Sequence, residues 1–283
     1  MKVHPKLTLL EIQEILAKLN GETDIISDEE LFNYIDLILI GLPFLTLKFK
    51  NGALFRARPN IGEELFTNTK ELWNPRTDWI KKNRFNDEKT EILYVSEAKS
   101  TVVEEVKPPP GSLLTLTTYV PVSELTFLPT GIQSGVTKTQ LFTEQYFQNI
   151  LLDKMKHYDN NPEYLQIDET INKYLYEQVT KENSKKDPNE YRFTNIYGKH
   201  VLLAPIDGLL YHSISRKLFD INIALKGEST CKLKIIQVEV IRMDPEIINR
   251  FELVACSNEF SEQGDIIYNG KCGSFDEMMQ IEK

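Results

Sequence analysis

The chain has 283 residues, of which 41% are apolar and 27% charged, a balance typical of a globular protein with a sizeable core. Its formal net charge of −9 argues against a general nucleic-acid binder, because phosphates must be met by clustered lysine and arginine. The N-terminus lacks the apolar region of a signal peptide, and no apolar run is long enough to span a bilayer. We therefore expect a cytoplasmic protein that contacts neither nucleic acid nor membrane.

The cysteines do not form a metal-binding pattern. Cys231, Cys256 and Cys272 are widely and irregularly spaced, and none belongs to a Cys-x-x-Cys pair or a Cys/His cluster. This spacing predicts reduced thiols and no metal site.

Two amphipathic helices are predicted at the N-terminus. The Thr8 and Glu11 pair has capping-box spacing, and Ser27 starts a second segment of the same kind. Gly41 and Pro43 are expected to end the second helix. Residues 1–43 thus read as a small helical cap in front of the main domain.

The pattern then changes to the two-residue period of strands. Apolar and polar residues alternate over residues 45–50, and Asn51-Gly52 predicts a tight hairpin to a second strand over residues 53–58. Arg56 and Arg58 share one face of that strand. Two neighbouring guanidinium groups suit a diphosphate, although a solvated strand face would show the same pattern.

A long loop and a short helix are expected next. Residues 60–90 contain few regular signals, and a loop of this length in a compact domain is often functional. Residues 91–96 form a buried strand that carries Tyr94. The capping-box spacing at Thr101 predicts the start of a helix that the prolines from Pro108 onward end. Glu104 and Glu105 both lie on this helix.

The second half of the chain mixes strands and helices. Residues 113–120 read as a strand and residues 121–137 as irregular chain. The segments 139–155 and 166–180 carry helical apolar stripes. Further strands are expected at 201–203, 209–211, 221–225 and 232–241.

The order of several short blocks resembles the RES family, which is named for an arginine, a glutamate and a serine. The blocks are Phe55-Arg56-Ala57-Arg58, Glu71-Leu72-Trp73-Asn74-Pro75, Asn83-Arg84-Phe85-Asn86, Ile92-Leu93-Tyr94, Thr101-Val102-Val103-Glu104-Glu105-Val106, Asp207-Gly208-Leu209-Leu210-Tyr211-His212-Ser213 and Asn222-Ile223-Ala224-Leu225. They cover roughly residues 50–228.

The resemblance implies an α+β fold: a bent, split sheet with flanking helices, similar to ADP-ribosyltransferases. It divides the chain into the cap (1–43), a RES-like catalytic domain (44–228) and a C-terminal strand and extension packed on the core (229–283). It also implies an NAD-cleaving toxin of a bacterial toxin–antitoxin pair, with phosphate as a co-substrate where the enzyme is a phosphorylase. No other cofactor is expected. The partner stays open: it can be an antitoxin protein or a second copy of the chain.

Residue roles follow from the same resemblance. Arg56 is expected to hold NAD phosphate, Arg84 to make a second phosphate or ribose contact, and Tyr94 to pack on nicotinamide. Glu105 falls in register with the family glutamate, although Glu104 stays open, and Ser213 matches the family serine. The expected catalytic set is thus Arg56, Tyr94 and Glu105, with Arg58, Arg84 and Ser213 as further NAD contacts.

The chemistry of nicotinamide–ribose cleavage fits these residue types. The transition state is oxocarbenium-like, so the site must anchor a diphosphate and stabilise positive charge on ribose. Arginines serve the first need and a carboxylate the second. The same residues would also be expected in an enzyme that transfers ADP-ribose to a macromolecule. They would be expected, too, in a site that has lost catalysis and only binds NAD or a partner.

Overall fold

The computed structural model describes residues 4–73, 82–132, 144–181, 191–215, 220–244 and 250–270. In these ranges the chain forms a mixed α+β fold. The α-helices are α1 (Leu9–Glu22), α2 (Asp28–Leu39), α3 (Lys99–Val106), α4 (Glu144–His157), α5 (Pro162–Val179) and α6 (Arg192–Val201); two short 3₁₀ helices are η1 (Thr69–Leu72) and η3 (Gly227–Lys232). The strands are β1 (Leu47–Phe49), β2 (Leu54–Pro59), β3 (Ile92–Ser96), β4 (Leu113–Pro121), β5 (Leu125–Pro129), β6 (Gly208–His212), β7 (Ile221–Lys226), β8 (Leu233–Met243), β9 (Phe251–Ser257), β10 (Glu259–Phe260) and β11 (Ile266–Ile267).

Nine strands form one mixed sheet that is nearly divided in two. Their order is β1-β5-β6-β7-β3-β2-β4-β8-β9, and only β5 and β6 run parallel. β2 pairs with β4 along its whole length, but it shares with β3 the single residue pair Phe55 and Ser96. Beyond that pair the two strands separate, which leaves an opening in the middle of the sheet. The predicted α+β class is confirmed, whereas the predicted bend and split of the sheet and its likeness to ADP-ribosyltransferases stay predictions.

The predicted hairpin between residues 45–50 and 53–58 is wrong. Gly52 does take a positive φ of 121°, so the chain turns there. However, β1 pairs with β5 at one end of the sheet, and β2 pairs with β4 near the middle. Leu47 and Phe49 are buried beside Phe127, and this tertiary packing outweighs the local turn preference.

Four other local predictions need correction. The strand expected at residues 201–203 is instead the end of α6 and a turn, and α6 itself was missed. β5 lies inside the segment predicted to be irregular. The predicted helix at Thr101 begins earlier, at Lys99, after Ala98 as an N-cap without a side-chain hydrogen bond. The Thr101 hydroxyl bonds to Asp220 instead of capping the helix. The helix predicted at 139–155 corresponds to α4 from residue 144 on, its first residues (139–143) lying outside the described ranges, and the helix predicted at 166–180 corresponds to α5.

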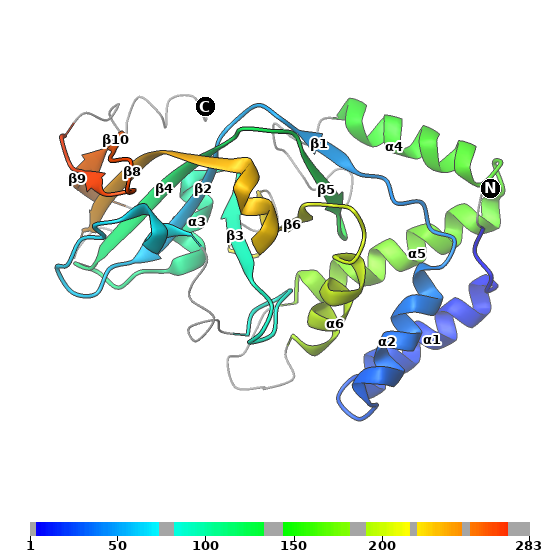
Figure 1. The fold of residues 1–283 in the computed structure, drawn as a ribbon. Helices are drawn as coiled ribbons and strands as arrows, with labels where there is room; N and C mark the ends of the chain where they lie inside the picture. The colour runs from blue at the N-terminus through cyan, green and yellow to red at the C-terminus, as the bar shows by residue number, and fades with distance from the viewer. Residues whose placement is uncertain are drawn as a thin grey trace.

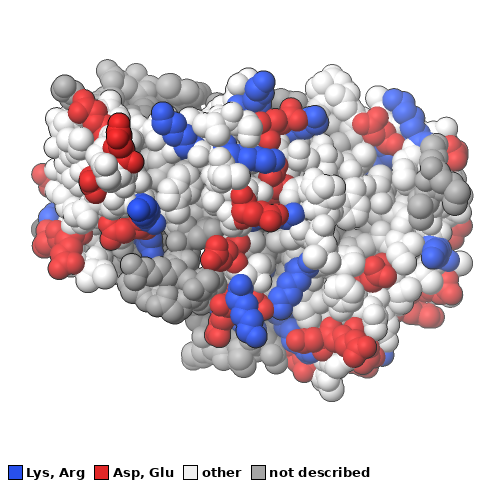
Figure 2. All heavy atoms as spheres, in the orientation of Figure 1, with Lys and Arg blue, Asp and Glu red and all other residues white. Residues whose placement is uncertain are grey.

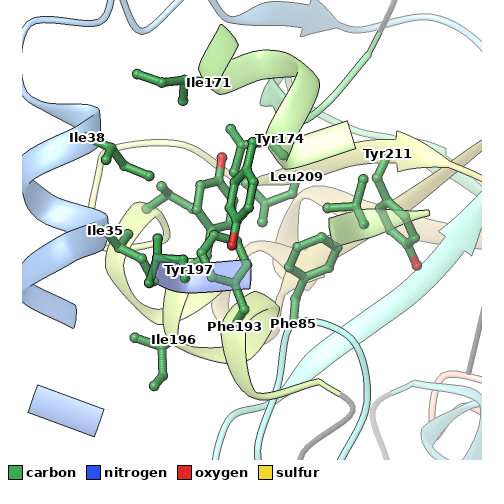
Figure 3. Close-up of a cluster of buried hydrophobic side chains, with 14 of the residues drawn as sticks. Ile35, Ile38, Phe85, Ile171, Tyr174, Phe193, Ile196, Tyr197, Leu209 and Tyr211 are labelled. Atoms are coloured by element: carbon green, nitrogen blue, oxygen red, sulfur yellow. The ribbon is translucent and has the colours of Figure 1, made fainter. Parts of the chain in front are cut away.

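A helical layer covers one end of the sheet (Figure 1). Thr8 and Glu11 form the predicted capping box of α1, and the Ser27 side chain caps α2. α1 packs on α5 and α2 packs on α6. Their apolar side chains join one continuous core with residues of the sheet, which include Leu209 and Ala224. Figure 3 shows part of this core, with Ile35 and Ile38 of α2 close to residues of α5 and α6.

The opposite end of the sheet holds α3 and the C-terminal strands. β8 pairs with β4 along its length, and β9 forms the outer edge. α3 packs on Ala57, Leu114 and other residues of these strands. At its first turn, the Lys99 ammonium bonds to the Glu239 carboxylate of β8, and both side chains are almost fully buried. This ion pair fixes the start of α3 against the sheet.

The surface carries charges of both signs. On the face shown in Figure 2, lysine and arginine side chains are interspersed with aspartate and glutamate, and the described residues form no basic patch there. None of the helices that the structure describes combines the length and apolar character needed to cross a membrane. Of the cysteines in the described ranges, Cys231 is exposed and Cys256 buried, and both are free thiols. Cys272 lies outside the described residues.

Candidate functional site

A polar cavity of about 390 Å³ lies at the opening between β2 and β3. Pockets of a few hundred cubic ångströms hold small molecules and cofactors in proteins. The lining comes from both halves of the sheet, from α3, and from the start of α6. The lining residues are Arg56, Ala57, Asn83, Arg84, Tyr94, Val95, Val102, Glu105, Val106, Tyr191, Tyr211, His212, Ile214 and Asn222. Four of the six predicted site residues, Arg56, Arg84, Tyr94 and Glu105, are thus brought to one cavity.

Glu105 is the carboxylate of the cavity. Its Oε1 accepts a hydrogen bond of 2.5 Å from the Ser213 hydroxyl and one of 2.8 Å from the Asn222 amide. Within the described residues, Oε2 has no hydrogen-bond partner, so it can accept one from a ligand. Glu104 does not line the cavity. The sequence left open which of the two glutamates matches the family glutamate. The structure brings Glu105, and not Glu104, to the cavity.

The position of Glu105 in its helix is unfavourable for a carboxylate. It lies in the last turn of α3, directly before Val106 and the left-handed residue Lys107. The C-terminal end of a helix carries partial negative charge, which disfavours a carboxylate there. Local rules are broken in this way mostly where a side chain serves a site rather than the fold.

Arg84 brings a buried positive charge to the same cavity. The residue is 8% exposed, and its guanidinium lies 5.3 Å from the centre of the Tyr191 ring. Within the described residues, the guanidinium makes one long hydrogen bond, of 3.5 Å, to the Lys181 carbonyl. No carboxylate of the described residues forms an ion pair with it. A buried guanidinium without a carboxylate partner is suited to an anionic ligand, because a buried charge is costly unless it is paired.

The turn that carries Arg84 is held from two sides. Asn83 and Asn86 form a β-bridge. The Asn195 amide of α6 donates to the carbonyls of Asn83 (2.6 Å) and Arg84 (3.1 Å). A backbone bridge and the Asn195 side chain thus fix the backbone from which the guanidinium projects.

Tyr94 contributes its ring to the cavity wall. Its hydroxyl accepts from the Phe85 amide (3.0 Å) and donates to Asn86 Oδ1 (2.9 Å). Burial raises the pKa of Tyr94 above its ordinary value, so the phenol stays neutral. Because the hydroxyl is occupied, a stacking contact is the role open to Tyr94. The packing of Tyr94 on nicotinamide, which the RES resemblance implies, stays a prediction.

The two strand arginines bind the protein's own backbone. As predicted, they share a face of β2, while Phe55 and Ala57 pack on α3. Arg56 donates from Nη1 to the carbonyls of Leu72 (3.1 Å) and Trp73, and it also lines the cavity.

Arg58 lies farther along β2 and does not line the cavity. It bonds to the Glu71 carbonyl, with its guanidinium 5.5 Å from the centre of the Phe66 ring. Burial lowers its pKa, and the neighbouring Arg56 charge adds to this effect. Arg58 therefore fastens the 66–72 segment to the sheet, and the structure does not bring it to the other predicted site residues.

Ser213 and Asn222 together orient Glu105. Ser213 does not line the cavity directly but follows His212, which does. Asn222 was not predicted as a site residue. The signal that could have identified it is a polar side chain within the apolar strand of residues 221–225, since a buried amide requires a partner. Tyr191, Tyr211 and His212 are further lining residues that the sequence analysis did not assign.

No group of histidine, cysteine, aspartate and glutamate within the described ranges is arranged to hold a metal ion.

Comparison with known proteins gives little further guidance. No family model matches the sequence, and no curated protein matches it. A chain of the M. tuberculosis MbcT–MbcA toxin–antitoxin complex aligns over 77% of this chain and 93% of its own length, at 11% identity and a TM-score of 0.38. A similarity this low carries no argument about fold or function.

Proposed function

We propose that the chain cleaves the nicotinamide–ribose bond of NAD and transfers the ADP-ribosyl group to phosphate or water. The main support is one arrangement among the described residues: a carboxylate that is hydrogen-bonded on one oxygen only, in the same cavity as a buried guanidinium without a carboxylate partner there and an aromatic wall. The order of the RES-like sequence blocks supports the same reaction. Arg56, Arg84, Tyr94 and Glu105 come from four of those blocks.

In the proposed reaction, the bond from C1′ to the nicotinamide nitrogen breaks, and the bonding electron pair leaves with nicotinamide, which becomes neutral. A phosphate or water oxygen forms the new bond to C1′; attack by water also releases a proton. Positive charge on the ribose grows as the first bond lengthens. A fixed negative group beside the ribose lowers the energy of that transition state most when it needs no reorganisation.

The protein groups have separate tasks in this scheme. Oε2 of Glu105 accepts a hydrogen bond from a ribose hydroxyl, while Ser213 and Asn222 keep the carboxylate in place. Arg84, with Arg56, meets the diphosphate. The Tyr94 ring packs on nicotinamide and keeps the leaving group in line. A toxin role, with an antitoxin as partner, rests on the RES resemblance alone.

The test is nicotinamide release from NAD by the purified protein, with and without phosphate, followed by chromatography. We expect release by the wild type and a loss of about 10²- to 10³-fold in Glu105→Gln, because the substitution removes the charge and keeps the shape. Glu104→Gln is the matched control and should stay within about threefold of wild type.

The products identify the acceptor. A sugar phosphate that appears only with phosphate indicates a phosphorylase, and free ADP-ribose indicates a glycohydrolase. Equal activity in Glu105→Gln and wild type would contradict the proposed mechanism. No release by folded wild type at high enzyme concentration would contradict NAD cleavage itself, and label from NAD retained on an added macromolecule would redirect the assignment to a transferase.

A further inference from the structure

Tyr211 of β6 is a buried tyrosine whose two ends have different surroundings. The residue is 6% exposed, and its ring meets the Phe85 ring edge-on, with 5.0 Å between centroids. Figure 3 shows the hydroxyl on the side turned away from the apolar cluster. On that side Tyr211 lines the central cavity, together with Glu105 and Arg84.

The hydroxyl of Tyr211 has no hydrogen-bond partner within the described residues. This distinguishes it from three other buried tyrosines. Tyr94 bonds to Phe85 and Asn86, Tyr158 bonds to Asp168, and Tyr197 lies 3.3 Å from Thr130 Oγ1. Buried tyrosine hydroxyls normally have a partner, because an unmet polar group is costly. Because the Tyr211 hydroxyl lies at a polar cavity, a ligand bound in that cavity can supply the missing hydrogen-bond partner.

The surroundings of the Tyr211 hydroxyl keep it protonated, so that it can donate a hydrogen bond. Burial raises the pKa of Tyr211 well above its ordinary value; Tyr94 and Glu105 raise it further, while Arg84 opposes them. The phenol is therefore neutral and able to donate near neutral pH. Tyr211 lines the same cavity as the Glu105 carboxylate and the Arg84 guanidinium.

We propose that Tyr211 is a ligand-contacting residue, whose hydroxyl donates a hydrogen bond to a ribose or phosphate oxygen of a nucleoside diphosphate sugar bound between Glu105 and Arg84. The proposal rests on the proposed function and extends it to a residue on β6. It identifies the ribose–phosphate part of the ligand as the part that Tyr211 contacts. Nicotinamide, by contrast, is assigned to Tyr94.

The experiment measures the affinity of ADP-ribose for wild type and Tyr211→Phe by calorimetry. The substitution removes the hydroxyl and leaves the ring against Phe85. We expect about tenfold weaker binding, since one hydrogen bond to a ligand oxygen commonly contributes about that factor. Nicotinamide release from NAD should fall by at least the same factor.

Tyr174→Phe is the matched control. The Tyr174 hydroxyl is also buried without a partner in the described chain, but it lies in the helical core and does not line the cavity. Its removal should leave ADP-ribose affinity unchanged within about twofold, and circular dichroism should confirm that both variants fold.

Equal affinities of wild type and Tyr211→Phe for ADP-ribose would overturn the proposal for Tyr211 while leaving NAD cleavage intact. ADP-ribose binding that weakens as expected, without any nicotinamide release by the wild type, would support Tyr211 as a contact and reject the catalytic function. Failure of folded wild type to bind ADP-ribose at millimolar concentration would overturn both.

Discussion

Glu104 and Glu105 are neighbours in sequence, yet the structure gives only one of them a place in the cavity. The difference comes from residues more than a hundred positions away, because Ser213 and Asn222 both donate to Oε1 of Glu105. Charge-assisted hydrogen bonds of this kind fix a carboxylate more firmly than neutral ones. The orientation of Glu105 is therefore a property of the β6–β7 region as much as of α3.

Ser213→Ala tests this dependence at the level of one residue. We expect the kcat for nicotinamide release to fall about tenfold, because the carboxylate loses one of the two bonds that hold it. The KM for NAD should change by less than about twofold. In a Glu105→Gln background the same substitution should have almost no further effect, since coupled residues are not additive. An equal loss in both backgrounds would mean that Ser213 contacts the ligand instead of positioning Glu105.

At the scale of elements, α6 fixes the turn that carries Arg84. Gly198 of α6 faces this turn: a Cβ there would lie 3.0 Å from the Phe85 carbonyl oxygen and 3.2 Å from Phe85 Cβ. These distances are tighter than normal contacts, so the turn must shift to admit even one methyl group. Gly21 of α1 has nothing within 4 Å of such a Cβ and offers a matched comparison.

Alanine at these two helical glycines should have opposite effects. Gly21→Ala should stabilise the protein by up to about 1 kcal/mol, the usual gain for this change in a helix. In Gly198→Ala, the close contact with Phe85 should cancel this stabilisation. The displaced turn should also weaken ADP-ribose binding several-fold. Urea unfolding and calorimetry measure the two effects. If Gly198→Ala is as stabilising as Gly21→Ala and binds ADP-ribose normally, the turn is not held by α6.

The same turn is tied to α6 by an ion pair, which makes its stability depend on pH. Asp87 lies 2.7 Å from the Lys199 ammonium. Burial acts to raise the pKa of Asp87, but the Lys199, Lys89 amide and Thr90 hydrogen bonds outweigh it and lower the pKa from 3.8 to about 2. A carboxyl group with a depressed pKa stabilises the fold above its unfolded pKa, and this stabilisation is lost as the pH falls toward the folded value.

Asp87→Asn should therefore destabilise the protein near neutral pH and progressively less in acid. We expect a difference of about 1 kcal/mol at about pH 6, after allowance for solvent screening of the partly exposed pair, shrinking by about half near pH 3. Urea unfolding of both proteins over this range measures the difference. A difference that stays constant with pH would show that Asp87 is not charged in the way the geometry implies.

Sequence patterns predicted most elements but not how they meet. The strand at residues 91–96, the long helices and the Thr8 capping box follow from local periodicity and caps, which depend on nearby residues. The hairpin at Asn51-Gly52 failed because partner strands are chosen by tertiary packing. Arg58 lies outside the cavity lining for a related reason: a shared face on β2 does not fix how far along the strand the cavity extends. Asn222 and Tyr211 became site residues only through the register of β6 with β7, which pairs Tyr211 with Asn222.

At the scale of the whole molecule, the N-terminal helices share a core with the elements that carry the site. One apolar cluster contains Leu31 and Ile35 of α2, residues of α5 and α6, and also Phe85 and Tyr211. The side chain that faces the proposed ligand is thus packed on the same cluster as the first helices. A cluster of this extent predicts that the helical layer and the sheet unfold together, whereas a separate 1–43 cap would unfold by itself.

Leu31→Ala distinguishes these two possibilities. Leu31 is fully buried in α2, and its truncation should lower the free energy of unfolding by about 2–5 kcal/mol. Far-UV circular dichroism follows the helices. Fluorescence in a Trp79→Phe background follows Trp73, which packs on Tyr119 of β4 at 5.0 Å between ring centroids. Both signals should shift to lower urea by the same amount, although Leu31 and Trp73 belong to different apolar clusters. Leu37→Ala, at a 40% exposed position of the same helix, should shift both by much less. Two separate midpoints, with only the helical signal moved by Leu31→Ala, would instead show that the cap is an independent unit and that Tyr211 does not depend on it.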